Sequence, residues 1–190
     1  TGVGYFICNL PGLFTATAEA QSLIAGLLCL AGLGVTFASL PAIADRHDYR
    51  PGSRAKFLLT LCSFTALVWL DSAAFFIVQN TPGLKAGTWH GSLHLWVNGS
   101  LHFAAAIASA LLLRRKKLSP VLTTAVLVLG SACLLLRNPD QALLASVLYP
   151  IGVSLYSVAL VAYPGLLAPA ANGEACGKTA GWLYAVAGWT

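Results

Sequence analysis

Long apolar runs constrain what this chain can fold into more than any motif does. A helix rises about 1.5 Å per residue, so a run of about 20 residues spans the roughly 30 Å hydrocarbon core of a bilayer. Charged residues make up only 9% of the chain, against about 25% in a soluble domain. The sequence therefore predicts an all-α fold, a polytopic integral membrane bundle of five to six transmembrane helices in a single domain over residues 1–190. The expected spans are residues 22–44, 56–78, 93–113, 119–136, 142–168 and a truncated one from 177.

Neither end of the sequence has the marks of a natural terminus. The chain has no initiator Met. Residues 1–20 also lack a basic segment followed by an apolar core and a cleavage site, so they do not resemble a signal peptide. We expect the chain to be a fragment of a longer protein.

The loops between the apolar runs differ in charge. Of the 11 Lys and Arg residues, all but Lys85 and Arg137 fall on one side of the expected bundle. By the positive-inside bias these basic loops are expected to be cytoplasmic, in what we take to be the inner membrane of a bacterium. The net charge of +5 then reflects topology and contact with anionic lipids. Because no soluble face can present a basic patch, the expected partner is the lipid bilayer and not a nucleic acid.

The third run holds the densest group of polar residues. Gly-Ser-Leu-His occurs twice, ending at His94 and at His102. On a helix these histidines lie about 80° apart and roughly 12 Å along the axis, with Asn98 between them. A buried neutral imidazole can ligate haem iron or magnesium, bond a quinone carbonyl, or pass a proton. His94 and His102 are therefore candidate cofactor and metal ligands, and interhelical hydrogen bonding is the structural alternative.

Asp71 lies in the middle of the second run. An ionisable side chain at membrane depth is costly enough to suggest a functional role. Counting inward from the outer ends of the second and third runs places Asp71 at about the depth of Asn98 to His102. A carboxylate–histidine pair is therefore geometrically available and would fix the imidazole tautomer, and we count Asp71 and Asn98 as candidate cofactor-binding residues. The same pair could instead only hold helices together.

The fifth run carries a regular series of tyrosines, with Pro150 and Pro164 inside it. A buried tyrosine hydroxyl usually finds a partner. In one interpretation the hydroxyls bond carbonyls that the prolines leave free. In the other, the stripe lines a quinone, pigment or proton path, and Tyr156 contacts a cofactor. The series recurs every seven residues, at Tyr149, Tyr156 and Tyr163.

One short segment resembles a known family. His94-Leu95-Trp96-Val97-Asn98-Gly99 is similar to the His-Leu-Trp-Val-Glu-Gly run on a catalytic-subunit helix of nitric-oxide reductases, in the haem–copper oxidase superfamily. The resemblance implies that His94 matches the histidine that binds the non-haem metal and that Asn98 replaces the neighbouring glutamate. The family's His-His pair on the next helix has no counterpart in residues 120–136. The resemblance therefore implies a degenerate relative or a fragment that has lost a complete dinuclear centre.

Three classes of function remain open. The first is a membrane-embedded subunit of a redox or electron-transfer complex, which anchors other membrane or periplasmic subunits and holds haem, a quinone or a chlorophyll-type pigment. The second is a structural accessory subunit without a cofactor, and the third is a proton-coupled transporter in which Asp71 and His102 titrate. No Cys-x-x-Cys-His is present, so covalent c-type haem is not expected. Because no catalytic constellation is complete, we expect a non-catalytic subunit.

Overall fold

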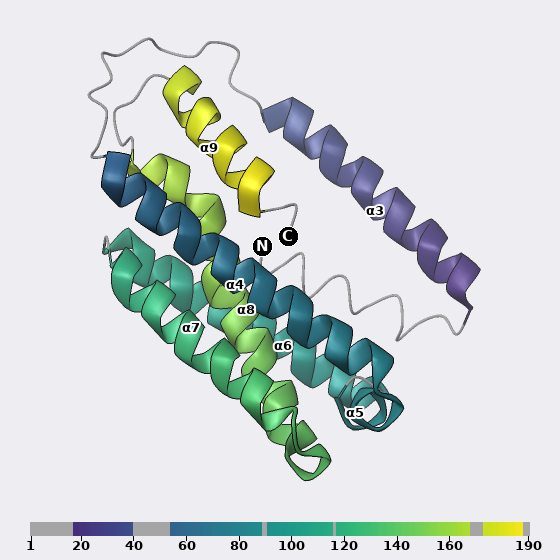
Figure 1. Ribbon diagram of the computed structural model, residues 1–190. Coiled ribbons are helices and arrows are strands. Elements are labelled where there is room, and N and C mark those ends of the chain that lie inside the picture. The colour runs from purple at the N-terminus through teal and green to yellow at the C-terminus, as the bar shows by residue number, and fades with distance from the viewer. Residues whose placement is uncertain (1–16, 40–53, 89–90, 116, 168–172, 188–190) are drawn as a thin grey trace.

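The structure is a computed structural model that describes residues 17–39, 54–88, 91–115, 117–167 and 173–187 (Figure 1). Every regular element within these ranges is a helix, which confirms the expected all-α fold. In chain order they are α3 (Ala18–Ser39), α4 (Arg54–Asn80), α5 (Pro82–Thr88), α6 (Ser92–Arg114), α7 (Leu118–Leu135), the 3-10 turn η1 (Pro139–Gln141), α8 (Ala142–Leu167) and α9 (Gly173–Ala187).

Each apolar run predicted from the sequence coincides with a helix. α4, α6, α7 and α8 begin and end within two residues of the second to fifth runs. α3 begins four residues before the first run, whose last residues, 40–44, lie outside the described part of the chain, and α9 begins four residues before the sixth run. The short helix α5 lies between the second and third runs, where the sequence predicts only a connecting loop over residues 79–92.

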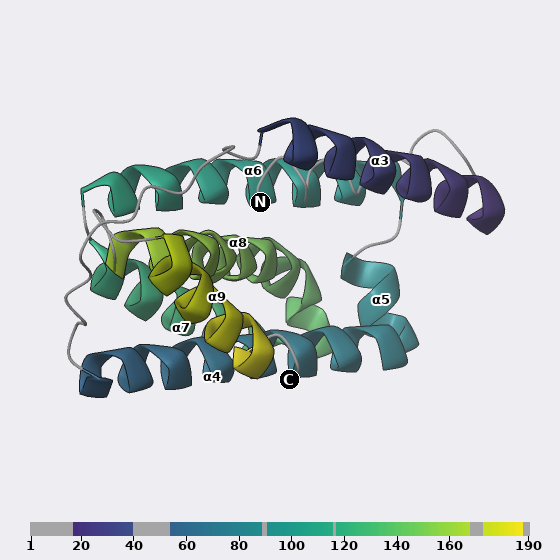
Figure 2. The ribbon, with the colours of Figure 1, turned by 90° about the horizontal axis from the view of Figure 1, so that it is seen from above.

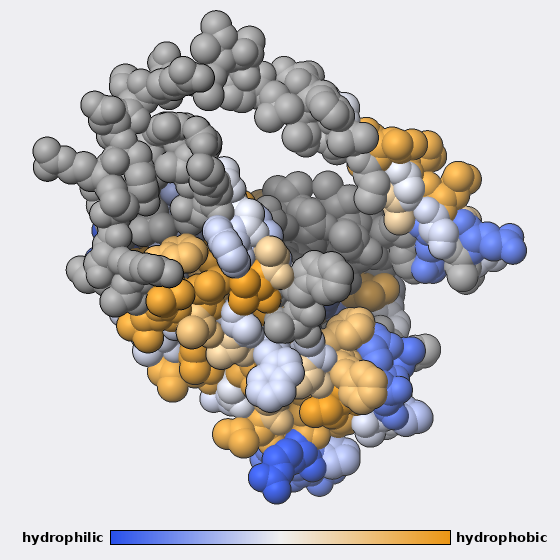
Figure 3. Space-filling view, turned by 45° about the horizontal axis from the view of Figure 1, so that its top comes forward, coloured by the Kyte–Doolittle hydropathy of each residue, from blue (hydrophilic) through white to orange (hydrophobic). Residues whose placement is uncertain are grey.

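Four helices are long and apolar enough to cross a membrane: Phe57–Asn80, Ser92–Arg114, Leu118–Leu135 and Pro139–Pro164. α3 and α9 are not among them, so the described residues give four candidate spans rather than the expected five to six. Large apolar side chains are exposed on the outer faces of these helices. In Figure 3 apolar side chains cover much of one face, and hydrophilic ones gather at its lower and right edges. An apolar surface of this extent suits contact with lipid.

α8 lies at the centre of the bundle. In its most apolar stretch 56% of the residues are buried, against 22–28% in the other three spans, and α6 and α7 both pack along it. It stays helical through Pro150 and Pro164, which neighbouring helices make tolerable in a membrane bundle. α7 approaches α8 so closely that a Cβ added at Gly152 would lie 2.9 Å from the Cβ of Leu129. A small residue is therefore required at this crossing.

The two ends of the bundle differ in charge. Successive long helices alternate in direction, so the turn between α6 and α7 lies at the same end as the start of α4 (Figure 1). Arg114, Arg115 and Lys117 are exposed at that turn. Lys85 in α5 and Arg137 after α7 are exposed at the opposite end. The helix directions thus agree with the separation of basic loops expected from the sequence.

Candidate functional site

A cavity of about 660 Å³ lies between α4, α6 and α8. α4 and α6 lie on opposite sides of α8 in Figure 2, and within the described ranges they make no extended contact with each other. α5 and the turn η1 contact each other at the end of the bundle opposite the turn between α6 and α7 (Figure 1).

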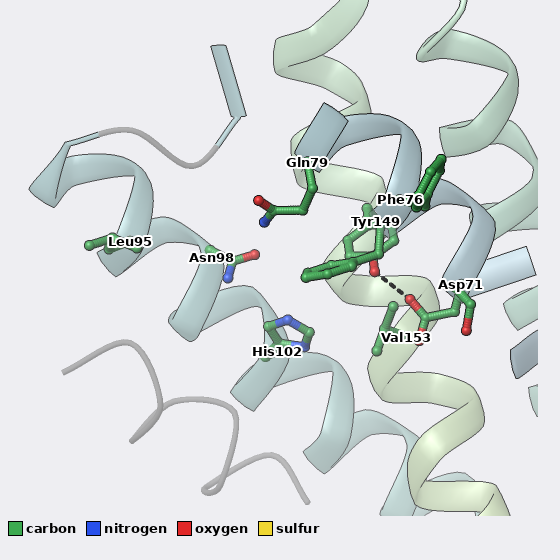
Figure 4. A pocket seen from close by; sticks show the side chains of 10 residues that line it. Asp71, Phe76, Gln79, Leu95, Asn98, His102, Tyr149 and Val153 are labelled. Atoms are coloured by element: carbon green, nitrogen blue, oxygen red, sulfur yellow. Dashed lines mark hydrogen bonds between the residues drawn. The ribbon is translucent and has the colours of Figure 1, made fainter. Parts of the chain in front are cut away.

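Helical periodicity explains which side chains line the cavity. Residues three or four apart share one face of a helix. In Figure 4 Asn98 and His102 of α6 point into the cavity, facing side chains of α4 and α8. The lining residues are Asp71, Ser72, Phe75, Phe76 and Gln79 from α4, Leu95, Asn98 and His102 from α6, and Tyr149 and Val153 from α8.

Asp71 is held by two tyrosines of α8. The hydroxyl of Tyr149 donates to Oδ1 of Asp71, and the hydroxyl of Tyr156 donates to Oδ2. The tyrosines are two helical turns apart on one stripe, so their long side chains converge on the carboxyl group from either side. Both tyrosines are buried, whereas Asp71 is half-buried and lines the cavity. The two hydrogen bonds compensate for part of the solvation that the carboxyl group loses on burial.

His102 is connected to α8 as well. Its Nδ1 lies 2.8 Å from the Oγ of Ser154, and both side chains are buried. Two turns further along α6, the hydroxyl of Ser109 donates to the carbonyl oxygen of Leu155 at 3.1 Å. These two contacts fix α6 against α8. The Ser154 contact also restrains the orientation of the imidazole in the cavity wall.

Asp71 and His102 do not form the carboxylate–histidine pair that their depth allows. Asp71 and His102 line the same cavity, as their similar depth suggested, but both carboxylate oxygens of Asp71 bond tyrosines and His102 bonds a serine. The reason is the position of α8, which lies between α4 and α6 and supplies partners to both. The hydroxyls of Tyr149 and Tyr156 likewise bond a side chain, the carboxyl group of Asp71.

The other expected site residues are only partly brought together. Asn98 and His102 line the cavity, and Tyr156 reaches it through Asp71. His94 is half-buried and is not among the lining residues, so the two expected metal ligands do not converge there. Within the described ranges no three His, Cys, Asp or Glu side chains are grouped to hold a metal ion. Tyr163 packs on Phe64 with ring centroids 5.6 Å apart.

Some lining residues were not anticipated. Phe75 and Gln79 follow Asp71 at intervals of four residues, so they share its helix face. That spacing is visible in the sequence and could have identified them once Asp71 was singled out. Two other histidines of the sequence, His47 and His90, lie outside the described residues.

Comparison of the chain with protein-family models, with curated proteins and with solved structures finds no match. The class of protein consequently follows from the fold and the site alone. Over its described residues the chain is helical, with four helices long and apolar enough to cross a membrane and a central helix that borders a partly polar cavity.

Proposed function

We propose that the chain is a membrane-embedded subunit of a redox or electron-transfer complex and that the cavity between α4, α6 and α8 binds a lipid-soluble quinone-type ring. The observation that carries this proposal is the lining of the cavity. Phe75 and Phe76 offer flat apolar contact, while Asn98, His102 and Gln79 offer hydrogen-bonding groups. A volume of about 660 Å³ is within the range of small-molecule sites.

The donor set favours a quinone-type ring over haem. The carbonyl oxygens of a quinone accept hydrogen bonds, which an imidazole or a carboxamide can donate. Haem with two axial histidines would need a second histidine in the cavity, and among the described lining residues His102 stands alone. Haem or a chlorophyll-type pigment would thus be held by His102 on one side only, and would supply one-electron transfer or light absorption there.

The resemblance of residues 94–99 to nitric-oxide reductases stays a prediction, and the proposal does not depend on it. His94, which carries the resemblance, lies outside the cavity lining. His102 is the histidine that the proposal uses, because it borders the cavity and is oriented by Ser154.

The orientation is part of the same proposal. The end that exposes Arg114, Arg115 and Lys117 faces the cytoplasm of a bacterium, because positively charged loops are retained on that side of the inner membrane. The exposed apolar faces meet lipid or other membrane subunits of the complex. Periplasmic partners would meet the opposite end, which bears α5 and η1.

Direct binding tests the proposal. The purified protein in detergent micelles is titrated with a short-chain benzoquinone, and bound ligand is measured by equilibrium dialysis. His102→Leu should weaken binding about tenfold or more, because a buried donor of the site is lost. The matched control His94→Leu, on the same helix but outside the lining, should bind as the unmodified protein does. Absence of binding by the unmodified protein, or equal loss in both variants, would overturn the proposal.

A structural accessory role is the second candidate. The hydrogen bonds from Tyr149 and Tyr156 to Asp71, from Ser109 to Leu155, and between His102 and Ser154 all join different helices. Such bonds stabilise a membrane bundle whether or not a ligand is present. An absorption spectrum without haem or pigment bands, together with no quinone binding, would favour this role.

A further inference from the structure

We propose that the cavity prefers the reduced, hydroxyl-bearing form of its ring ligand, a hydroquinone, over the oxidised quinone, and that Asp71 sets this preference. The inference rests on the proposed function, since it concerns the ligand of the same cavity. It names the chemical form of that ligand, which neither the size nor the apolar lining of the cavity determines.

The hydrogen-bond pattern at Asp71 supports a carboxylate. Each carboxyl oxygen of Asp71 has a tyrosine hydroxyl within hydrogen-bond reach, and two hydroxyls that can both donate suit an ionised carboxylate. An ionised carboxylate offers about four acceptor positions and no donor. Tyr149 and Tyr156 occupy two of them, and Asp71 still lines the cavity (Figure 4).

The two forms of a ring ligand meet this group differently. A hydroquinone hydroxyl can donate to the carboxylate, and a bond of this charge-assisted kind is among the strong ones. A quinone carbonyl carries only lone pairs, so its oxygen is repelled at the same position. One such bond corresponds to binding the hydroquinone about tenfold to a hundredfold more tightly than the quinone.

The polar groups of α6 do not oppose this preference. Asn98 has both a donor and an acceptor in its amide. Nδ1 of His102 lies at Ser154, and because the serine hydroxyl can donate or accept, either tautomer is allowed and Nε2 can take either role. They can therefore bond either a hydroxyl or a carbonyl at the far end of the ring. Gln79 on α4 has the same versatility. Asp71 is the one carboxylate among the described lining residues, and so the one side chain there that can only accept.

Equilibrium dialysis under argon compares the two forms of one ligand, a decyl-tailed benzoquinone and its hydroquinone. The unmodified protein should bind the hydroquinone at least about tenfold more tightly. Asp71→Asn should remove most of this ratio, because an amide can also donate to a carbonyl. Tyr156→Phe removes one partner of the carboxylate but keeps the carboxylate in the cavity wall, so it should retain the preference.

The outcomes separate this inference from the proposed function. If neither form binds, the proposed function fails. If both forms bind the unmodified protein equally, or if Asp71→Asn keeps the full ratio, the role of Asp71 is overturned while ligand binding stands. Should Asp71→Asn not fold, the ratio measured on the unmodified protein and on Tyr156→Phe still decides, since equal binding of both forms contradicts the inference.

Discussion

Replacing Gly152 by alanine tests how tightly α7 and α8 are packed. A Cβ at this position would lie 2.9 Å from the Cβ of Leu129, 3.0 Å from its backbone nitrogen and 3.1 Å from its Cα. All three atoms belong to the α7 backbone or are attached directly to it. A change of rotamer at Leu129 therefore cannot relieve the contact, and the helices must separate by several tenths of an ångström.

The cost of this separation can be bounded. Overpacking by one methyl group in a tight interior costs about 1–3 kcal/mol. This cost is partly offset, because replacing glycine by alanine within a helix stabilises the helix by up to about 1 kcal/mol. Gly130→Ala is the matched control, because a Cβ at Gly130 would meet no atom within 4 Å. Since both variants share the helix-propensity gain, the difference between them should be the overpacking cost of about 1–3 kcal/mol.

The measurement is unfolding in mixed micelles with increasing dodecyl sulfate, followed by circular dichroism. Gly152→Ala should unfold at a lower fraction of dodecyl sulfate than the unmodified protein, and Gly130→Ala at an equal or higher one. Equal unfolding midpoints for the two variants would refute the close approach of α7 to α8 and the central place of α8 with it.

The hydrogen bonds at the site and the placement of the charged loops can be tested in the same preparations. In a variant without native cysteines, single cysteines at Lys117 and Lys85 should be labelled from opposite faces of sealed vesicles; labelling from one face would contradict the alternation of the helices. Ser109→Ala should lower the free energy of unfolding by about 0.5–1 kcal/mol, as is typical of an interhelical hydrogen bond in a membrane, and an unchanged value would mean that this bond does not stabilise the bundle. Asp71→Leu should cost at least about 2 kcal/mol, because two buried tyrosine hydroxyls lose their acceptor; a smaller loss than for Ser109→Ala would show that the tyrosines find other partners.

The helices themselves were predictable because their positions follow from the length and hydropathy of continuous stretches of sequence. Apolar length alone placed α4, α6, α7 and α8 to within two residues of their ends. α5 was missed because its seven residues are far shorter than a membrane span, so hydropathy gives it no signal. Its start at Pro82 is a position where proline is favoured, but such a proline is equally common in loops.

The candidate site was predictable only in part. Depth in the membrane follows from counting residues, and it correctly brought Asp71, Asn98 and His102 to one cavity. Rotation about the helix axis does not follow from counting when a span is apolar on nearly all sides. The partners of Asp71 and His102 depend on that rotation and on which helix lies between them. The sequence therefore indicated that Asp71 and His102 share one depth, but not that α8 supplies a partner to each of the two.

The position of α8 explains why so many polar groups gather on one apolar helix. Protein surrounds α8 more completely than the other three spans, so it can carry polar residues on more than one face without exposing them to lipid. Tyr149 and Tyr156 use the face toward α4, and Ser154 uses the face toward α6. A hydroxyl on an exposed helix face can bond only a carbonyl of its own helix, as Ser63 and Ser146 do. The polar side of the cavity is consequently tied to the central packing of α8, and a substitution that loosens α8 against its neighbours should weaken ligand binding even when it touches no lining residue.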